Sequence, residues 1–102
     1  MKILRVAKQA IPYSVDVRIA GETFKFTFDY NVEGDFFTVD LMRDDEVICL
    51  GEKIVYGKAL FTSFLDHYFP LSPIVPIDRA LKDTRVGWNE LENTVFLYVL
   101  EG

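Results

Sequence analysis

Three reverse-turn signals divide the first half of the chain into four segments in which apolar and polar residues alternate. We expect a two-residue turn at Gly21-Glu22, a loop over residues 31–34 and a turn at Asp44-Asp45. The aligned apolar pairs are then Ile19 with Phe24, Val17 with Phe26, Val15 with Phe28, Phe28 with Phe37, Phe26 with Val39, Phe24 with Leu41, Leu41 with Ile48, and Val39 with Leu50. Because a one-residue slip would turn a strand's apolar set to the other face, this agreement predicts an antiparallel meander from residue 13 to about residue 50.

The alternate positions of the same segments are polar, so one face of the predicted sheet lies in the core and the other meets solvent. This polar set is Asp16, Arg18, Thr23, Lys25, Thr27, Thr38 and Asp40. The single cysteine, Cys49, falls on the polar row opposite Asp40, and with no second cysteine the chain cannot form an internal disulfide.

Before the meander, residues 3–7 suit a short opening strand, and Pro12 marks the start of the first long strand at Tyr13. After the meander, residues 54–56 could extend it. Residues 59–69 fit helical and strand periodicity equally well, and we favour an extended or irregular conformation because Gly57 and Pro70 frame them.

The last third of the chain predicts two further strands. Residues 74–77 can form a strand only at a sheet edge, because Pro76 has no backbone donor. Residues 78–84 suggest a solvated turn, and residues 88–91 one helical turn. Residues 94–100 are apolar at both odd and even positions, so a strand there needs cover on both faces, from its own domain or from another subunit.

These patterns predict a mainly β protein. We expect a single domain over residues 1–102, with an antiparallel meander that closes into a small barrel or a two-layer sandwich and at most one or two short helical turns.

Composition points to assembly and away from nucleic acids. Half of the residues are hydrophobic and 15% are aromatic, which is more apolar surface than a domain of this size readily buries. The net charge is -5, and the cations Lys2, Arg5 and Lys8 form no basic run, so we expect no direct nucleic-acid binding. With no signal-peptide pattern and no long apolar run, we also expect no membrane association and synthesis without export.

Residues that could carry chemistry are few. His67 is the only histidine; Ser63 lies four residues before it and Asp66 beside it, but a partly exposed loop histidine explains the pattern better than a catalytic pair. Cys49 lacks an adjacent base, and the acidic cluster at residues 44–46 lacks the ligand spacing of a calcium loop. We therefore predict no catalytic residues, no metal site and no cofactor.

Four aromatic residues are left outside the predicted core rows: Phe36, Trp88, Phe96 and Tyr98. Aromatic side chains are common anchors at protein interfaces, so these four are the candidate interface residues. The alternative is that they fill a second layer of the same domain.

Taken as a whole, the chain resembles the small phage baseplate plug family, which is also found in prophages and takes its name from a contractile-tailed cyanophage. The matching blocks are Ile11-Pro12-Tyr13, Gly21-Glu22 with Phe24-x-Phe26-x-Phe28, Tyr30-Asn31, Asp35-Phe36-Phe37-Thr38-Val39-Asp40-Leu41, Val55-Tyr56-Gly57 with Leu60-Phe61, Ile74-Val75-Pro76-Ile77-Asp78, and Thr94-Val95-Phe96-Leu97-Tyr98. Two loop positions depart from the pattern: Ala59, where proline is expected, and residues 80–82, which replace a more polar turn.

The resemblance implies a structural protein of the virion tail, present in the host cytoplasm during assembly and without catalytic activity. Its implied partners are hub, tube and other baseplate proteins at the tail axis, with a homo-oligomer also open. Two other classes fit the residues: a small β-barrel that binds an apolar ligand, and a small acidic inhibitor with a basic target.

Overall fold

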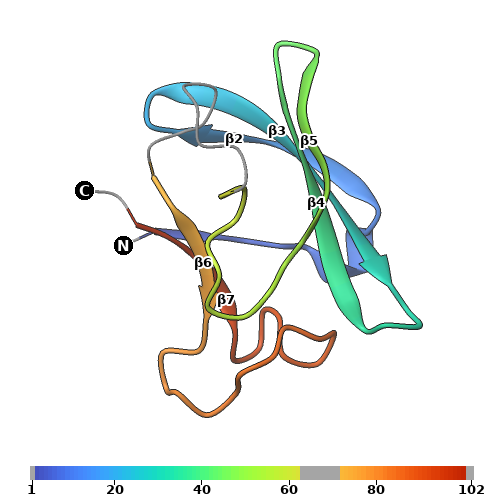
Figure 1. Ribbon diagram of the computed structural model, residues 1–102, viewed down its shortest axis with the longest axis vertical. Coiled ribbons are helices and arrows are strands. Elements are labelled where there is room, and N and C mark those ends of the chain that lie inside the picture. The colour runs from blue at the N-terminus through green and yellow to red at the C-terminus, as the bar shows by residue number, and fades with distance from the viewer. Residues whose placement is uncertain (1, 63–71, 101–102) are drawn as a thin grey trace.

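The computed structural model describes residues 2–62 and 72–100, which form two antiparallel sheets (Figure 1). One sheet contains, in order, β2 (Tyr13–Ile19), β3 (Glu22–Asn31), β4 (Phe36–Arg43) and β5 (Glu46–Lys53). The other has the order β1-β7-β6, from β1 (Lys2–Leu4), β7 (Phe96–Val99) and β6 (Ile74–Ile77). The sheets form two layers and do not close into a barrel. Of the two predicted architectures, a small barrel and a two-layer sandwich, the structure has the sandwich.

The meander is confirmed, but its first two pairings differ from the predicted register by two residues. The first turn lies at Ala20-Gly21, one residue earlier than predicted, so Ile19 pairs with Glu22 and Val17 with Phe24. Both turn residues have positive φ, 52° and 81°, as a type I′ hairpin requires. The next loop also moves by one residue, to residues 32–35, and Phe28 then pairs with Val39. Because both shifts are even, the side chains of β2, β3 and β4 keep their predicted faces.

The fourth strand departs from the predicted alternation. The Asp44-Asp45 turn is confirmed, with Arg43 paired to Glu46, but β5 then shifts register twice. Leu41 consequently pairs with Cys49, which is buried and only 6% exposed, while Leu50 is 67% exposed. The predictions of Cys49 on the polar row and Leu50 in the core were wrong, because each bulge adds a residue and turns the following side chains to the other face.

The core between the sheets contains the predicted phenylalanines. Phe24, Phe26, Phe28 and Phe37 are fully buried and belong to one apolar cluster with residues of the smaller sheet, including Leu97 and Val99. The polar set of the opposite face is exposed or half-buried, as expected.

The remaining strands largely follow the sequence pattern. The opening strand is shorter than expected and ends at Leu4, and β2 begins at Tyr13 directly after Pro12. Residues 54–56 do not extend β5, although the Ile54 amide still donates to the Phe37 carbonyl at 2.9 Å. The β6 strand lies at a sheet edge, as Pro76 requires, and β7 lies between β1 and β6.

Three segments outside the strands can be compared with the predictions. Residues 60–62 form a turn, and the rest of the ambiguous segment, from residue 63, lies outside the described residues. The predicted helical turn near Trp88 is a hydrogen-bonded turn in which the Leu91 amide donates to the Gly87 carbonyl at 3.0 Å. A short 3₁₀ helix occupies Lys8–Ala10. No α-helix occurs in residues 2–62 and 72–100.

The turn after β6 is not uniformly solvated, because Asp78 is only 3% exposed. Its carboxylate accepts hydrogen bonds from the amides of Ala80, Lys82 and Asp83 at 2.9, 3.1 and 3.0 Å. These bonds hold the pKa of Asp78 below its ordinary value, the Asp83 amide having the largest effect. The charge pattern led us to expect solvent here, whereas the carboxylate organises the loop from inside.

Candidate partner-binding surface

The side of the three-stranded sheet that faces away from the core is apolar. Strand alternation directs Leu97 and Val99 into the core, where they are at most 1% exposed, and turns the neighbouring side chains outward. We call this surface the apolar outer face; it consists of Ile3, Val75, Ile77, Phe96 and Tyr98. Ile3, Tyr98 and Val75 lie in one row across the sheet, and Phe96 and Ile77 lie in the next.

Two arginines lie over the rings of this face. The Arg5 guanidinium carbon is 5.3 Å from the centre of the Phe96 ring, and that of Arg79 is 6.0 Å from the centre of the Tyr98 ring. Arg5 also pairs with Glu92 at 2.8 Å. Guanidinium groups at such distances gain a modest cation–π attraction while their charges stay in water. Among the residues that the structure describes, the second face of β7 is thus covered in part by long cationic side chains.

Two of the four predicted interface residues lie together on this face. The Phe96 and Tyr98 rings are 6.4 Å apart in an edge-on arrangement. Phe96, Ile3, Val75 and Ile77 are half-buried, whereas Tyr98 is only 5% exposed and contacts Phe96 and Arg79. In this conformation the accessible apolar area therefore comes from the four half-buried residues.

Trp88, the third predicted interface residue, lies at one end of the sandwich. Its ring stacks on Phe37 at 5.9 Å and meets Tyr30 edge-on at 4.9 Å. Lys8 donates to the Trp88 carbonyl and lies 5.3 Å from the centre of the ring. Trp88 is half-buried, so one part of its ring closes the core and another part remains accessible.

Asp35 connects this end of the larger sheet to the segment before β7. Its carboxylate accepts hydrogen bonds from the Tyr30 hydroxyl at 2.5 Å and the Trp88 amide at 2.8 Å, and it pairs with Arg85 at 2.5 Å. These donors, Tyr30 first, hold the pKa of Asp35 below its ordinary value. The same hydrogen bond raises the pKa of Tyr30. Asp35 therefore remains ionised at neutral pH and fastens the two loops together.

Phe36, the fourth predicted interface residue, lies on the polar side of the larger sheet. It is half-buried, and the Lys53 ammonium group is 4.5 Å from the centre of its ring. The ring also lies against Gly34, where an added Cβ would come within 2.5 Å of it. The structure thus places the four candidates in three separate regions of the surface.

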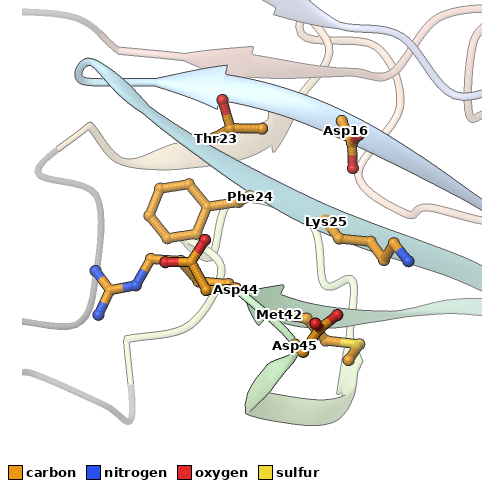
Figure 2. A pocket seen from close by; sticks show the side chains of 8 residues that line it. Asp16, Thr23, Phe24, Lys25, Met42, Asp44 and Asp45 are labelled. Atoms are coloured by element: carbon orange, nitrogen blue, oxygen red, sulfur yellow. The ribbon is translucent and has the colours of Figure 1, made fainter.

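A shallow pocket of about 200 Å³ opens on the polar side of the larger sheet (Figure 2). It is lined by Asp16, Thr23, Phe24, Lys25, Met42, Arg43, Asp44 and Asp45. Charged groups of both signs dominate this lining, and the pocket lies outside the apolar core. It therefore does not match the interior apolar site that a ligand-binding barrel would require.

The residues considered for catalysis are not brought together in the described part of the chain. His67, Ser63 and Asp66 lie outside the described residues. The thiol of Cys49 is buried, and its burial, followed by the charges of Glu52 and Asp40, raises its pKa. Within residues 2–62 and 72–100 there is no cluster of three or more metal-ligating side chains, and no helix long and apolar enough to span a membrane.

Sequence reasoning missed Asp35, Asp78 and the two arginines on the outer face. Asp78 directly follows a strand and precedes a loop, a position where aspartate commonly accepts backbone hydrogen bonds, so its role had a local signal. Asp35 had none, because its partner amide belongs to Trp88, 53 residues away. Arg79 looked like an ordinary loop cation, and its contact with Tyr98 depends on the pairing of β6 with β7.

The fold and this surface define a small all-β protein of two antiparallel layers, with an apolar face on the smaller sheet. A comparison with protein-family models matches all of residues 1–102 to the family described as cyanophage baseplate Pam3 plug gp18. The chain therefore belongs to this baseplate plug family, which gives it a structural role in the phage tail, in association with other baseplate proteins. No curated protein and no solved structure matches the chain.

Proposed function

We propose that this protein assembles with the hub and tube proteins at the tail axis and acts there as a structural plug without catalysis. The observation that carries the proposal is the apolar outer face formed by β1, β6 and β7. The four half-buried apolar side chains of this face lose unfavourable contact with water when a neighbouring subunit covers them.

The contact we propose is centred on Phe96 and Ile77. The Tyr98 ring packs edge-on against Phe96 and so helps to fix its position. Arg5 and Arg79 lie at this face and can pair with carboxylates of a partner at the rim of the contact. Trp88 and Phe36 belong to separate regions, and we propose that they meet further baseplate subunits.

The acidity of the chain supports a place beside the path of the genome. With a net charge of -5, the protein repels phosphate and does not retain DNA that passes through the tube. We also propose that the chain is present in the host cytoplasm until it joins the baseplate.

The test is co-purification of the tagged chain with the hub and tube proteins of the same phage. Ile77→Glu places a carboxylate on the apolar outer face, and we expect at least tenfold less hub and tube protein to co-purify. Leu50→Glu places the same carboxylate on β5 of the larger sheet, where Leu50 is 67% exposed, and should leave co-purification as in the wild type. Equal recovery with both variants, each shown to be folded by circular dichroism, would contradict the proposed contact.

A further inference from the structure

The two sheets have four edge strands, and three of them carry features that hinder pairing with another chain. β1 has only three residues, β6 contains Pro76, and β5 has two register shifts. Short strands, prolines and bulges are the usual protection of sheet edges. β2 differs, because its seven residues pair one-to-one with β3 without a bulge or a proline. No other described strand pairs with β2.

The hairpin geometry indicates which backbone groups of β2 point to the open edge. Ile19 and Glu22 flank a two-residue turn, so they exchange both backbone hydrogen bonds. The alternation then directs the N–H and C=O groups of Ser14, Asp16 and Arg18 away from β3. In agreement, the Arg18 carbonyl accepts a hydrogen bond from the Lys2 ammonium group at 3.4 Å. The open edge therefore offers three residues for pairing.

The charges on β2 are complementary to those of a second, antiparallel copy of the same strand. Asp16 and Arg18 lie two residues apart, both exposed and on the same face, and neither has an ion pair within the described residues. If Val17 lies on a two-fold axis, Asp16 of each copy faces Arg18 of the other. If the two-fold axis instead passes through Asp16, Asp16 faces Asp16 of the other copy, and if it passes through Arg18, Arg18 faces Arg18. Repulsion between like charges disfavours both of these registers.

The same register also continues the apolar layer. Val17 meets Val17 of the second copy, and Val15, which is half-buried, meets Ile19. Asp16 and Arg18, whose backbone groups point to the open edge, then exchange both backbone hydrogen bonds with each other. Within the described part of the chain, the obstacle is the long Lys2 bond to the Arg18 carbonyl, which joins exposed groups and which an incoming backbone amide replaces.

We propose that two copies of this chain pair through β2, antiparallel and centred on Val17, to form one continuous eight-stranded sheet. The proposal is independent of the assignment of the outer face of β1, β6 and β7 to baseplate partners. It can fail while that assignment stands, because the two surfaces belong to different sheets.

Sedimentation equilibrium of the purified chain tests the pairing. We expect a species of twice the 11.8 kDa chain mass for the wild type, and at least tenfold weaker association for Asp16→Arg and for Arg18→Asp. The double variant, with both charges exchanged, should regain the dimer. Asp29→Arg, an equivalent charge change on the exposed side of β3, serves as the control and should remain dimeric. A wild-type chain that is monomeric up to about 1 mM overturns the proposal.

Disulfide cross-linking tests the register in the same material, with the native thiol removed by Cys49→Ala. Directly opposed residues that are not hydrogen-bonded have Cβ atoms about 4.5–5.5 Å apart, close enough for a disulfide after a small adjustment. We expect oxidised Val17→Cys to form a covalent dimer and Val15→Cys to remain uncross-linked. The reverse result, in variants with wild-type circular dichroism, rules out the two-fold axis at Val17.

Discussion

At the residue scale, the fold depends on phenylalanines buried between the two sheets and on single polar side chains, such as Asp35, that join its loops. The four core phenylalanines were predictable because their period of two agreed across neighbouring strands. Asp35 was not, because hydrogen bonds that join residues 50 or more positions apart leave no periodic trace. Phe96 and Tyr98 were identified as candidates by elimination, and only the strand pairing revealed their apolar neighbours Ile3, Val75 and Ile77.

Asp35→Asn should make the stability of the protein less dependent on pH. The folded-state pKa of Asp35 is lowered, so its ionised form stabilises the fold above the unfolded-state pKa of about 3.9, and this contribution is lost as the pH falls through the folded-state value. We expect the free energy of unfolding of the variant to lie below that of the wild type at pH 7 and closer to it at pH 3.

Urea denaturation followed by the fluorescence of Trp88, the only tryptophan of the chain, measures this difference directly. Asp29→Asn is a suitable control, because Asp29 is exposed and, among the described residues, accepts a hydrogen bond only from the amide of Tyr30. The same deficit at both pH values for Asp35→Asn would contradict the role assigned to its charge.

At the element scale, the sequence predicted which segments become strands better than how they pair. The first turn was misplaced because alanine rarely adopts the positive φ that Ala20 has. The second was misplaced because the loop ends at Asp35, one residue after Gly34, where the sequence suggested that it ends. The bulges of β5 had no clear signal except Gly51, whose φ is +69°. Alternation alone therefore placed Leu50 inside and Cys49 outside, the reverse of the observed arrangement.

Ala20→Asn should stabilise the β2–β3 hairpin. Ala20 has a φ of 52°, a conformation that costs most residues about 1 kcal/mol and that asparagine tolerates better. We expect the free energy of unfolding to rise by about 0.5–1 kcal/mol, measured by urea denaturation. Ala20→Val, which puts a β-branched side chain at the same φ, should lower it. A stabilised Ala20→Val variant would show that the turn has a different conformation in solution.

At the scale of the whole molecule, the structure separates an apolar face on the smaller sheet from an open strand edge on the larger one. The sequence of the last strand, β7, predicted that both of its faces need cover. In the structure one face of β7 packs in the core, and the guanidinium groups of Arg5 and Arg79 lie over aromatic rings of the other. The stoichiometry and the partners could not be derived in this way, because a surface pattern defines the chemistry of a neighbour and not its identity. Membership of the baseplate plug family indicates that the protein belongs to the phage tail.

We propose that a baseplate neighbour covers the outer face of β1, β6 and β7. Hydrogen–deuterium exchange of the free chain and of the same chain within isolated baseplates tests it most directly. We predict that exchange of the Ile74–Ile77 segment, an edge strand in the free chain, slows at least tenfold on assembly. Unchanged exchange in this segment, with slowing confined to the larger sheet, would contradict the account.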